Sequence, residues 1–211
     1  MYKETLQRYL DDLASNLPAP GGGSAAALAS ATGISLLSMV ANFTVGKEKY
    51  KSVEENVRRI LEVSEQLRLR LLELVDEDAA GYKQVSQAYK LPKETAEEKK
   101  QRRGAIQQAL KEALAVPLEV CKLSHQAAKL CPQLAEQGNP NLISDVGVAI
   151  VLVEAAFQSA LLNVEINLNG LKDEKFILEV REITEPLEKE IAAIKDQVWQ
   201  TVKQKMVEGA K

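Results

Sequence analysis

A single carboxylate interrupts an apolar stripe on a long predicted helix. In residues 51–89 apolar side chains recur in steps of three and four, and Asp78 is the only charged residue on that stripe. Asp76 lies two residues away, so it points roughly 200° around the helix at about 3.6 residues per turn. A buried aspartate has a raised pKa and can act as a general acid/base. It can equally be a structural hydrogen-bond hub, and the stripe alone leaves both interpretations open.

The second candidate is a turn rich in proline and glycine, PAPGGGS at residues 18–24. Proline fixes φ and glycine tolerates φ > 0, so the pattern predicts a non-helical turn through Gly21, Gly22 and Gly23. Ser24 is then the expected N-cap of the next helix. Bare N–H groups at a helix N-terminus can hold an anion or a polar ligand. They can also serve only a tight turn with close helix packing.

Polar residues on the predicted apolar helices give further candidates. Asn163 and Asn167 are four residues apart and share one face of a helix over residues 146–171. Buried amides either pair across helices or line a polar pocket. Lys47, with a second lysine two residues on, follows an uncharged helix, where it either complements the helix dipole or meets an anionic substrate tail.

A metal site has weak support. Cys121, His125 and Cys131 are the residues that a zinc site would use, but their spacing matches no common zinc pattern. We therefore predict no metal and treat His125 as an ordinary histidine. With two cysteines, no CxxC and no signal peptide at Met1, we expect a reducing cytoplasm.

Composition excludes some partners. A net charge of −3 and a pI near 5.5 leave no basic footprint for nucleic acid. Residues 25–45 are uncharged and long enough to cross a membrane, but their many serine, threonine and asparagine residues favour a buried helix of a soluble core.

Ala25, Ala29 and Gly33 share one face and allow close helix contact. Two nearly charge-free helices are more than a small bundle normally hides, so we predict a homodimer.

The elements that must position these residues are all helices, in one domain over residues 1–211. The predicted class is all-α, a multi-helix bundle with long antiparallel helices. The expected segments are residues 2–15, 25–45, 51–89, 93–117 with a kink or break at Pro117, 120–137, 146–171 with Asn141 or Ser144 as cap, and 173 to the C-terminus.

Seven segments in order along nearly the whole chain resemble one family. They are PAPGGGSAAAL (18–28), SMVANFTVGKEKY (38–50), LVDEDAAGY (74–82), LPKETAEEK (91–99), AVPLEV (115–120), GNPNLISDVGVA (138–149) and NVEINL (163–168). Together they are similar to the cyclodeaminase/cyclohydrolase family. That family includes the C-terminal half of formiminotransferase-cyclodeaminase and stand-alone bacterial methenyltetrahydrofolate cyclohydrolases.

The resemblance implies a helical dimer that binds a reduced folate in a cleft, with no cofactor. It implies a catalytic aspartate within VDEDA, either Asp76 or Asp78, and the stripe selects Asp78. The matched motifs hold the residues that we predict to bind substrate: Gly21, Gly22, Gly23, Ser24, Asn42, Lys47, Tyr82, Asn139, Asp145, Asn163 and Asn167.

The reaction that we rank first is that of a formiminotetrahydrofolate cyclodeaminase, giving 5,10-methenyltetrahydrofolate and ammonia. The alternative is a 5,10-methenyltetrahydrofolate cyclohydrolase. A second alternative, a non-catalytic helical association protein, gives no reason for Asp78, Asn163 and Asn167 on buried surfaces. The transferase half of the bifunctional enzyme is absent from this sequence, so formimino transfer is not assigned.

Overall fold

The structure is a computed structural model that describes residues 5–208 of the chain, and within them it is helical with no strand. The elements are α1 (Leu6–Ala14), α2 (Gly22–Asn42), η1 (Glu48–Tyr50), α3 (Glu54–Tyr89), α4 (Ala96–Ala128), α5 (Cys131–Gln137), η2 (Pro140–Leu142), α6 (Ile143–Asn169) and α7 (Glu174–Glu208). The predicted all-α class is confirmed. The start of the expected first helix, at residues 2–4, lies outside the described residues.

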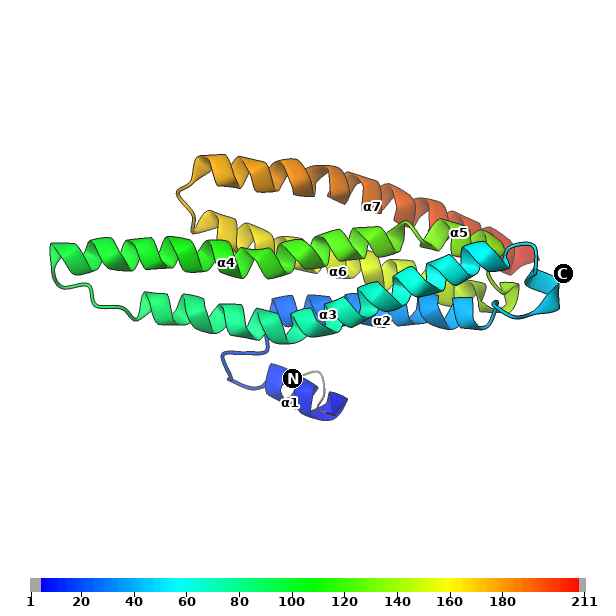
Figure 1. Cartoon of the computed structure of the whole chain (residues 1–211), viewed down its shortest axis with the longest axis horizontal. Coiled ribbons are helices and arrows are strands. Elements are labelled where there is room, and N and C mark those ends of the chain that lie inside the picture. The colour runs from blue at the N-terminus through cyan, green and yellow to red at the C-terminus, as the bar shows by residue number, and fades with distance from the viewer. Residues whose placement is uncertain (1–4, 209–211) are drawn as a thin grey trace.

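Long antiparallel helices make up the bundle. The α3–α4 and α6–α7 connections lie at one end, and the α2–α3 and α5–α6 connections lie at the other, as Figure 1 shows. The short helix α1 lies beside the bundle near the start of α2 (Figure 1). Helix α2 packs against both α3 and α6, so its first turn stands between these two helices.

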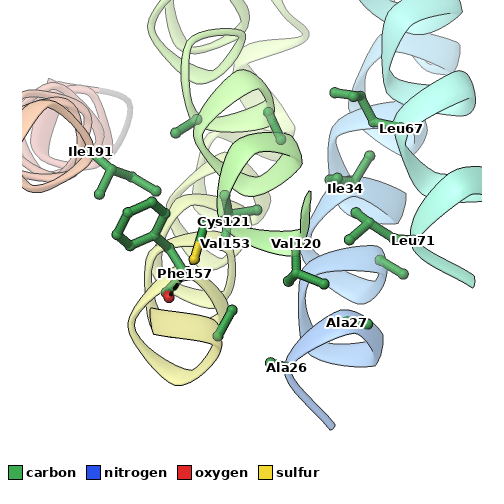
Figure 2. Close-up of a cluster of buried hydrophobic side chains, with 14 of the residues drawn as sticks. Ala26, Ala27, Ile34, Leu67, Leu71, Val120, Cys121, Val153, Phe157 and Ile191 are labelled. Atoms are coloured by element: carbon green, nitrogen blue, oxygen red, sulfur yellow. Dashed lines mark hydrogen bonds between the residues drawn. The ribbon is translucent and has the colours of Figure 1, made fainter. Parts of the chain in front are cut away.

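The core is built from small and branched apolar side chains of five helices. Ile34 of α2, Leu71 of α3, Val120 of α4, Phe157 of α6 and Ile191 of α7 are all fully buried (Figure 2). Close packing of α2 on α6 depends on a glycine. A Cβ at position 33 would lie 2.9 Å from Val153 Cγ2 and 3.0 Å from the Ala149 carbonyl oxygen, so a larger residue would push the helices apart.

The predicted break at Pro117 and the predicted caps of the helix that follows residue 141 are wrong. Pro117 does not break its helix, because α4 continues to Ala128. The side chain of Pro117 is buried, and the packing of a 33-residue helix outweighs a local cost of about 3 kcal/mol. Neither Asn141 nor Ser144 caps α6. Instead, Asn139 accepts a hydrogen bond from Asn141 N at the start of η2, and η2 leads directly into α6.

Two segments are long and apolar enough to cross a membrane by length and composition alone. They are Gly22–Asn42 and Pro140–Asn169, with 61% and 44% of their apolar windows buried inside the bundle. Both windows belong to the pair of helices that pack most extensively on each other, α2 and α6.

Candidate active site

A cleft of about 500 Å³ opens where the first turn of α2 meets α3, α4 and α6. It is lined by Pro18, Ala19, Gly21, Gly22, Gly23, Asp78, Tyr82, Val85, Tyr89, Leu110, Ala113, Pro117, Asn163, Ile166 and Asn167. Asp78 is the only charged residue among them, and Asp76 is not one of them. The structure thus places one lone carboxylate in a largely apolar cleft.

The Asp78 carboxylate is held by the N-terminus of α2. The backbone N–H of Ser24 donates to Asp78 Oδ2 over 2.9 Å. Desolvation by burial raises the pKa of Asp78 above its ordinary value, and the hydrogen bond from Ser24 partly opposes that rise. A carboxylate in this state is a stronger base than an exposed aspartate.

The glycines do not form the turn that we predicted. Helix α2 begins at Gly22 with Gly21 as its N-cap, and none of these glycines has a positive φ. Gly23 is needed for space, because a Cβ there would overlap Asp78 Oδ1. A Cβ at Gly22 would only touch the Asn163 amide, and one at Gly21 would meet nothing within 4 Å.

Ser24 is likewise not the N-cap. It lies inside the first turn of α2, where its hydroxyl hydrogen-bonds to the Tyr9 hydroxyl at 3.1 Å. Its backbone N–H is occupied by Asp78. The anion that this helix N-terminus holds in the structure is therefore a side chain of the protein itself.

The long wall of the cleft is aromatic. Tyr82, Val85 and Tyr89 follow Asp78 at helical spacing on α3 and line the cleft. Eleven residues separate Asp78 from Tyr89, which is roughly 16 Å along a helix axis. Both tyrosines are about half exposed. The shape and lining suit an elongated ligand with flat rings.

Asn163 and Asn167 provide acceptors on the facing wall. Asn163 Nδ2 donates to Ser159 O and Asn167 Nδ2 donates to Asn163 O, each over 2.8 Å. One N–H of each amide is used along the helix, so each side chain keeps an Oδ1 acceptor and a second N–H donor for a ligand.

The other predicted binding residues lie at the opposite end of α2. Asn42 is its last residue, and Lys47 precedes η1. Asn139 N donates to Thr44 Oγ1, and Asp145 lies in the first turn of α6. Helix α2 has 21 residues, about 30 Å at 1.5 Å per residue, so within one chain these four residues do not reach a ligand beside Asp78.

The three residues considered for zinc have separate partners. Cys121 contacts the Phe157 carbonyl oxygen at 3.7 Å (Figure 2), and Cys131 contacts that of Ala127. His125 Nε2 lies 2.8 Å from Glu190 Oε2. Within residues 5–208 no group of three His, Cys, Asp or Glu side chains could hold a metal ion.

Several cleft residues were not singled out from the sequence. Val85 and Tyr89 continue the stripe that carries Asp78, so the same periodicity could have identified them. Leu110, Pro117 and Ile166 resemble ordinary core residues, and only the packing of α4 and α6 shows that they face the cleft.

Comparison with known proteins identifies the family of this chain. A family model described as formiminotransferase-cyclodeaminase matches residues 5–186. Over 203 residues the chain is 44% identical to the methenyltetrahydrofolate cyclohydrolase of Methylorubrum extorquens, covering 96% of this chain and 98% of that protein. It is 35% identical to the formimidoyltransferase-cyclodeaminase of Mus musculus over 82% of this chain, which corresponds to 32% of the mouse protein. The crystal structure of formiminotetrahydrofolate cyclodeaminase from Thermotoga maritima matches with a TM-score of 0.82 and 34% identity, covering 99% of this chain and 98% of that one.

Proposed function

Since this chain belongs to the formiminotransferase-cyclodeaminase family of folate one-carbon enzymes, we propose that it is a cyclohydrolase that converts 5,10-methenyltetrahydrofolate to 10-formyltetrahydrofolate. The observation that carries the proposal is the 44% identity to a methenyltetrahydrofolate cyclohydrolase over almost the full length of both chains. The cyclodeaminase that the sequence analysis ranked first is matched at lower identity. We therefore rank the cyclohydrolase first and the cyclodeaminase second.

The lining of the cleft supports a placement for each part of a reduced folate. We place the pterin and its bridge against Asp78 and the amides of α6, where the Oδ1 atoms of Asn163 and Asn167 can accept hydrogen bonds from pterin N–H groups. The aminobenzoyl ring lies along Tyr82 and Tyr89. The apolar lining excludes water from the rest of the ligand.

Asp78 moves the protons in the proposed reaction. The methenyl bridge is a cationic N5–CH–N10 group, and water attacks its carbon while the Asp78 carboxylate takes one proton from that water. The protonated Asp78 then returns this proton to N5 as the C–N5 bond breaks. Loss of the remaining hydroxyl proton to solvent leaves the 10-formyl group, so one water is consumed and one proton is released.

The environment of Asp78 suits both halves of this cycle. Burial raises its pKa, which makes the carboxylate a better base than an exposed aspartate. The N–H of Ser24 holds Oδ2 of Asp78 in place. Because Gly23 has no Cβ, there is room beside it for Oδ1, the other oxygen of the same fixed carboxylate. These steps need no metal or cofactor.

The second candidate is the cyclodeaminase. In that reaction N10 attacks the formimino carbon on N5, and Asp78 protonates the departing nitrogen so that ammonia leaves. The structure of the Thermotoga maritima cyclodeaminase, which covers nearly all of this chain, favours this candidate. Formimino transfer is not proposed, since the chain matches about a third of the bifunctional relative.

The proposed enzyme is a cytoplasmic homodimer that associates through the outer faces of α2 and α6. Large apolar side chains exposed in the single chain are Val148, Val151 and Leu162 of α6 and Phe43 at the C-cap of α2. Leu162 is 72% exposed, which is unusual for a residue of such a central helix.

One spectrophotometric experiment separates the two reactions. The purified protein is given the methenyl substrate in one cuvette and 5-formiminotetrahydrofolate in another, with free ammonia measured in both. A cyclohydrolase bleaches the methenyl absorption band faster than the uncatalysed rate. A band that instead appears from the formimino substrate together with ammonia, without any accelerated bleaching, would support the cyclodeaminase.

A further inference from the structure

Helix α1 contacts the rest of the structure through one buried residue, Tyr9, and one partly buried leucine, Leu13. Tyr9 is its only buried residue, 5% exposed, whereas Leu6 and Leu10 on the same helix are 64% and 49% exposed. In Figure 1 α1 lies beside the bundle rather than within it. The buried contact of α1 with the start of α2 is therefore the one that Tyr9 makes.

That contact lies two hydrogen bonds away from the lone carboxylate of the cleft. The Tyr9 hydroxyl and Ser24 Oγ are 3.1 Å apart, and both residues are buried. The backbone N–H of the same Ser24 donates to Asp78 Oδ2 over 2.9 Å. Ser24 of α2 thus contacts the phenol of Tyr9 through its side chain and the carboxylate of Asp78 through its backbone.

We propose that Tyr9 is a positioning residue that, through the Ser24 side chain, keeps the Ser24 N–H aligned on the carboxylate of Asp78. This inference rests on the proposed function only where it concerns turnover, because the alignment itself is a property of the free protein. Without the Tyr9 hydroxyl, the first turn of α2 is free to shift. A weaker N–H bond then stabilises the charged carboxylate less.

Few other groups near Asp78 influence its charge. Tyr82 and Tyr89 on its own helix are the only other titratable residues that line the cleft. From α4 the lining residues are Leu110, Ala113 and Pro117, and from α6 they are two asparagines and Ile166, all of them uncharged. Burial raises the pKa of the Tyr9 phenol, the bond to Ser24 lowers it, and the charge of Asp78 raises it. The phenol therefore remains a neutral hydrogen-bonding group at neutral pH.

The test uses Tyr9→Phe in the full-length protein, because this change keeps the buried ring and removes only the hydroxyl. The pKa of Asp78 is followed by the ¹³C chemical shift of its carboxyl group, assigned with Asp78→Asn. We expect the pKa to rise by about 0.5 to 1 unit. Where the wild-type protein is active, the limb of kcat/KM that reports this group moves to higher pH by the same amount, and kcat falls more than KM rises.

Ser24→Ala is the second variant, since it breaks the same link from the other side. We expect the same displacement, and the double variant should add little to either single one because both break one chain of contacts. Ser124→Ala is the matched control. It removes a 2.8 Å hydroxyl pair with Ser30, further along α2 and away from the cleft, and should leave the Asp78 pKa unmoved.

The outcomes are distinct. An unchanged or lowered Asp78 pKa in Tyr9→Phe and Ser24→Ala overturns the inference, even if either variant unfolds at a lower temperature. An equal displacement in Ser124→Ala overturns it as well. A wild-type protein without folate turnover contradicts the proposed function, whereas the chemical-shift titration still decides the role of Tyr9.

Discussion

The carboxylate of Asp78, in the C-terminal third of α3, accepts a hydrogen bond from the backbone N–H of Ser24, in the first turn of α2, 54 positions earlier in the sequence. This bond brings a helix N-terminus, with its partial positive charge, onto the only charged side chain of the cleft. Burial and the helix end act on the pKa of Asp78 in opposite directions, and burial is the larger effect.

Gly23→Ala should impair catalysis without unfolding the bundle. A Cβ at this position would overlap Asp78 Oδ1, so the carboxylate must move away from its place. A displaced catalytic group can cost on the order of 10²-fold in turnover. The measurement is kcat for the methenyl substrate alongside far-UV circular dichroism.

Gly104→Ala is the control for that change. Gly104 is a helical glycine of α4 with open space around it, so alanine should stabilise the helix by about 0.5–1 kcal/mol and leave kcat unchanged. Full activity in Gly23→Ala would show that the close approach of Gly23 to Asp78 has no catalytic importance.

Asp78→Asn should stabilise the protein at neutral pH. The folded-state pKa of Asp78 lies above the ordinary value of 3.8. The favourable contribution of its protonated form is complete below that ordinary value and is lost as pH rises through the folded-state pKa. Asparagine stays neutral at every pH, so the variant does not lose this contribution to the free energy of unfolding. Its Tm should therefore exceed that of the wild type at pH 7, and the two values should converge near pH 3. A lower Tm of the variant at pH 7 would contradict the burial account.

Asn163→Ala should raise KM more than it lowers kcat. One N–H of its Nδ2 is bonded to Ser159 O, and the substitution removes the Oδ1 acceptor that we propose for the pterin. The loss of one neutral hydrogen bond corresponds to roughly 3- to 10-fold. Asn169→Ala, at the exposed end of α6, is the control and should change neither constant. An unchanged KM in Asn163→Ala would remove this residue from the binding site.

Light scattering should give twice the 23.2 kDa chain mass at micromolar concentration. Leu162→Glu places a charge on the exposed apolar face of α6 and should dissociate the dimer. Leu178→Glu changes a leucine of similar exposure, 61% against 72%, on α7 and should not. A wild-type protein of monomer mass would contradict the proposed association.

The periodicity of the sequence predicts much of the fold and one wall of the site. The stripe on residues 51–89 places Asp78 and Tyr82 toward the bundle and Asp76 elsewhere, and both of the former line the cleft. Such local patterns suffice because a helix face is set by spacing alone. The spacing of Asn163 and Asn167 likewise places both on the facing wall.

The parts that were predicted wrongly depend on contacts between distant segments. Glycines at 21–23 predict a turn, but Gly22 and Gly23 are helical, and Gly23 makes room for a carboxylate from another helix. The resemblance predicts that Asn42 and Asn139 share a pocket with Asp78, and this remains a prediction, since the length of α2 separates them within one chain. Tyr9 gives no local signal at all, because its role depends on the hydroxyl of Ser24.

The most direct test of the account measures bleaching of 5,10-methenyltetrahydrofolate by three proteins at equal concentration: wild type, Asp78→Asn and Asp76→Asn. We predict catalysed bleaching by the wild type and a loss of roughly 10²-fold or more in Asp78→Asn, the usual scale of general acid/base catalysis. Asp76→Asn, whose side chain does not line the cleft, should stay within about twofold of the wild type, since surface changes away from a site are mild. Bleaching by Asp78→Asn at the wild-type rate, or a loss confined to Asp76→Asn, would contradict the assignment of Asp78 as the catalytic group.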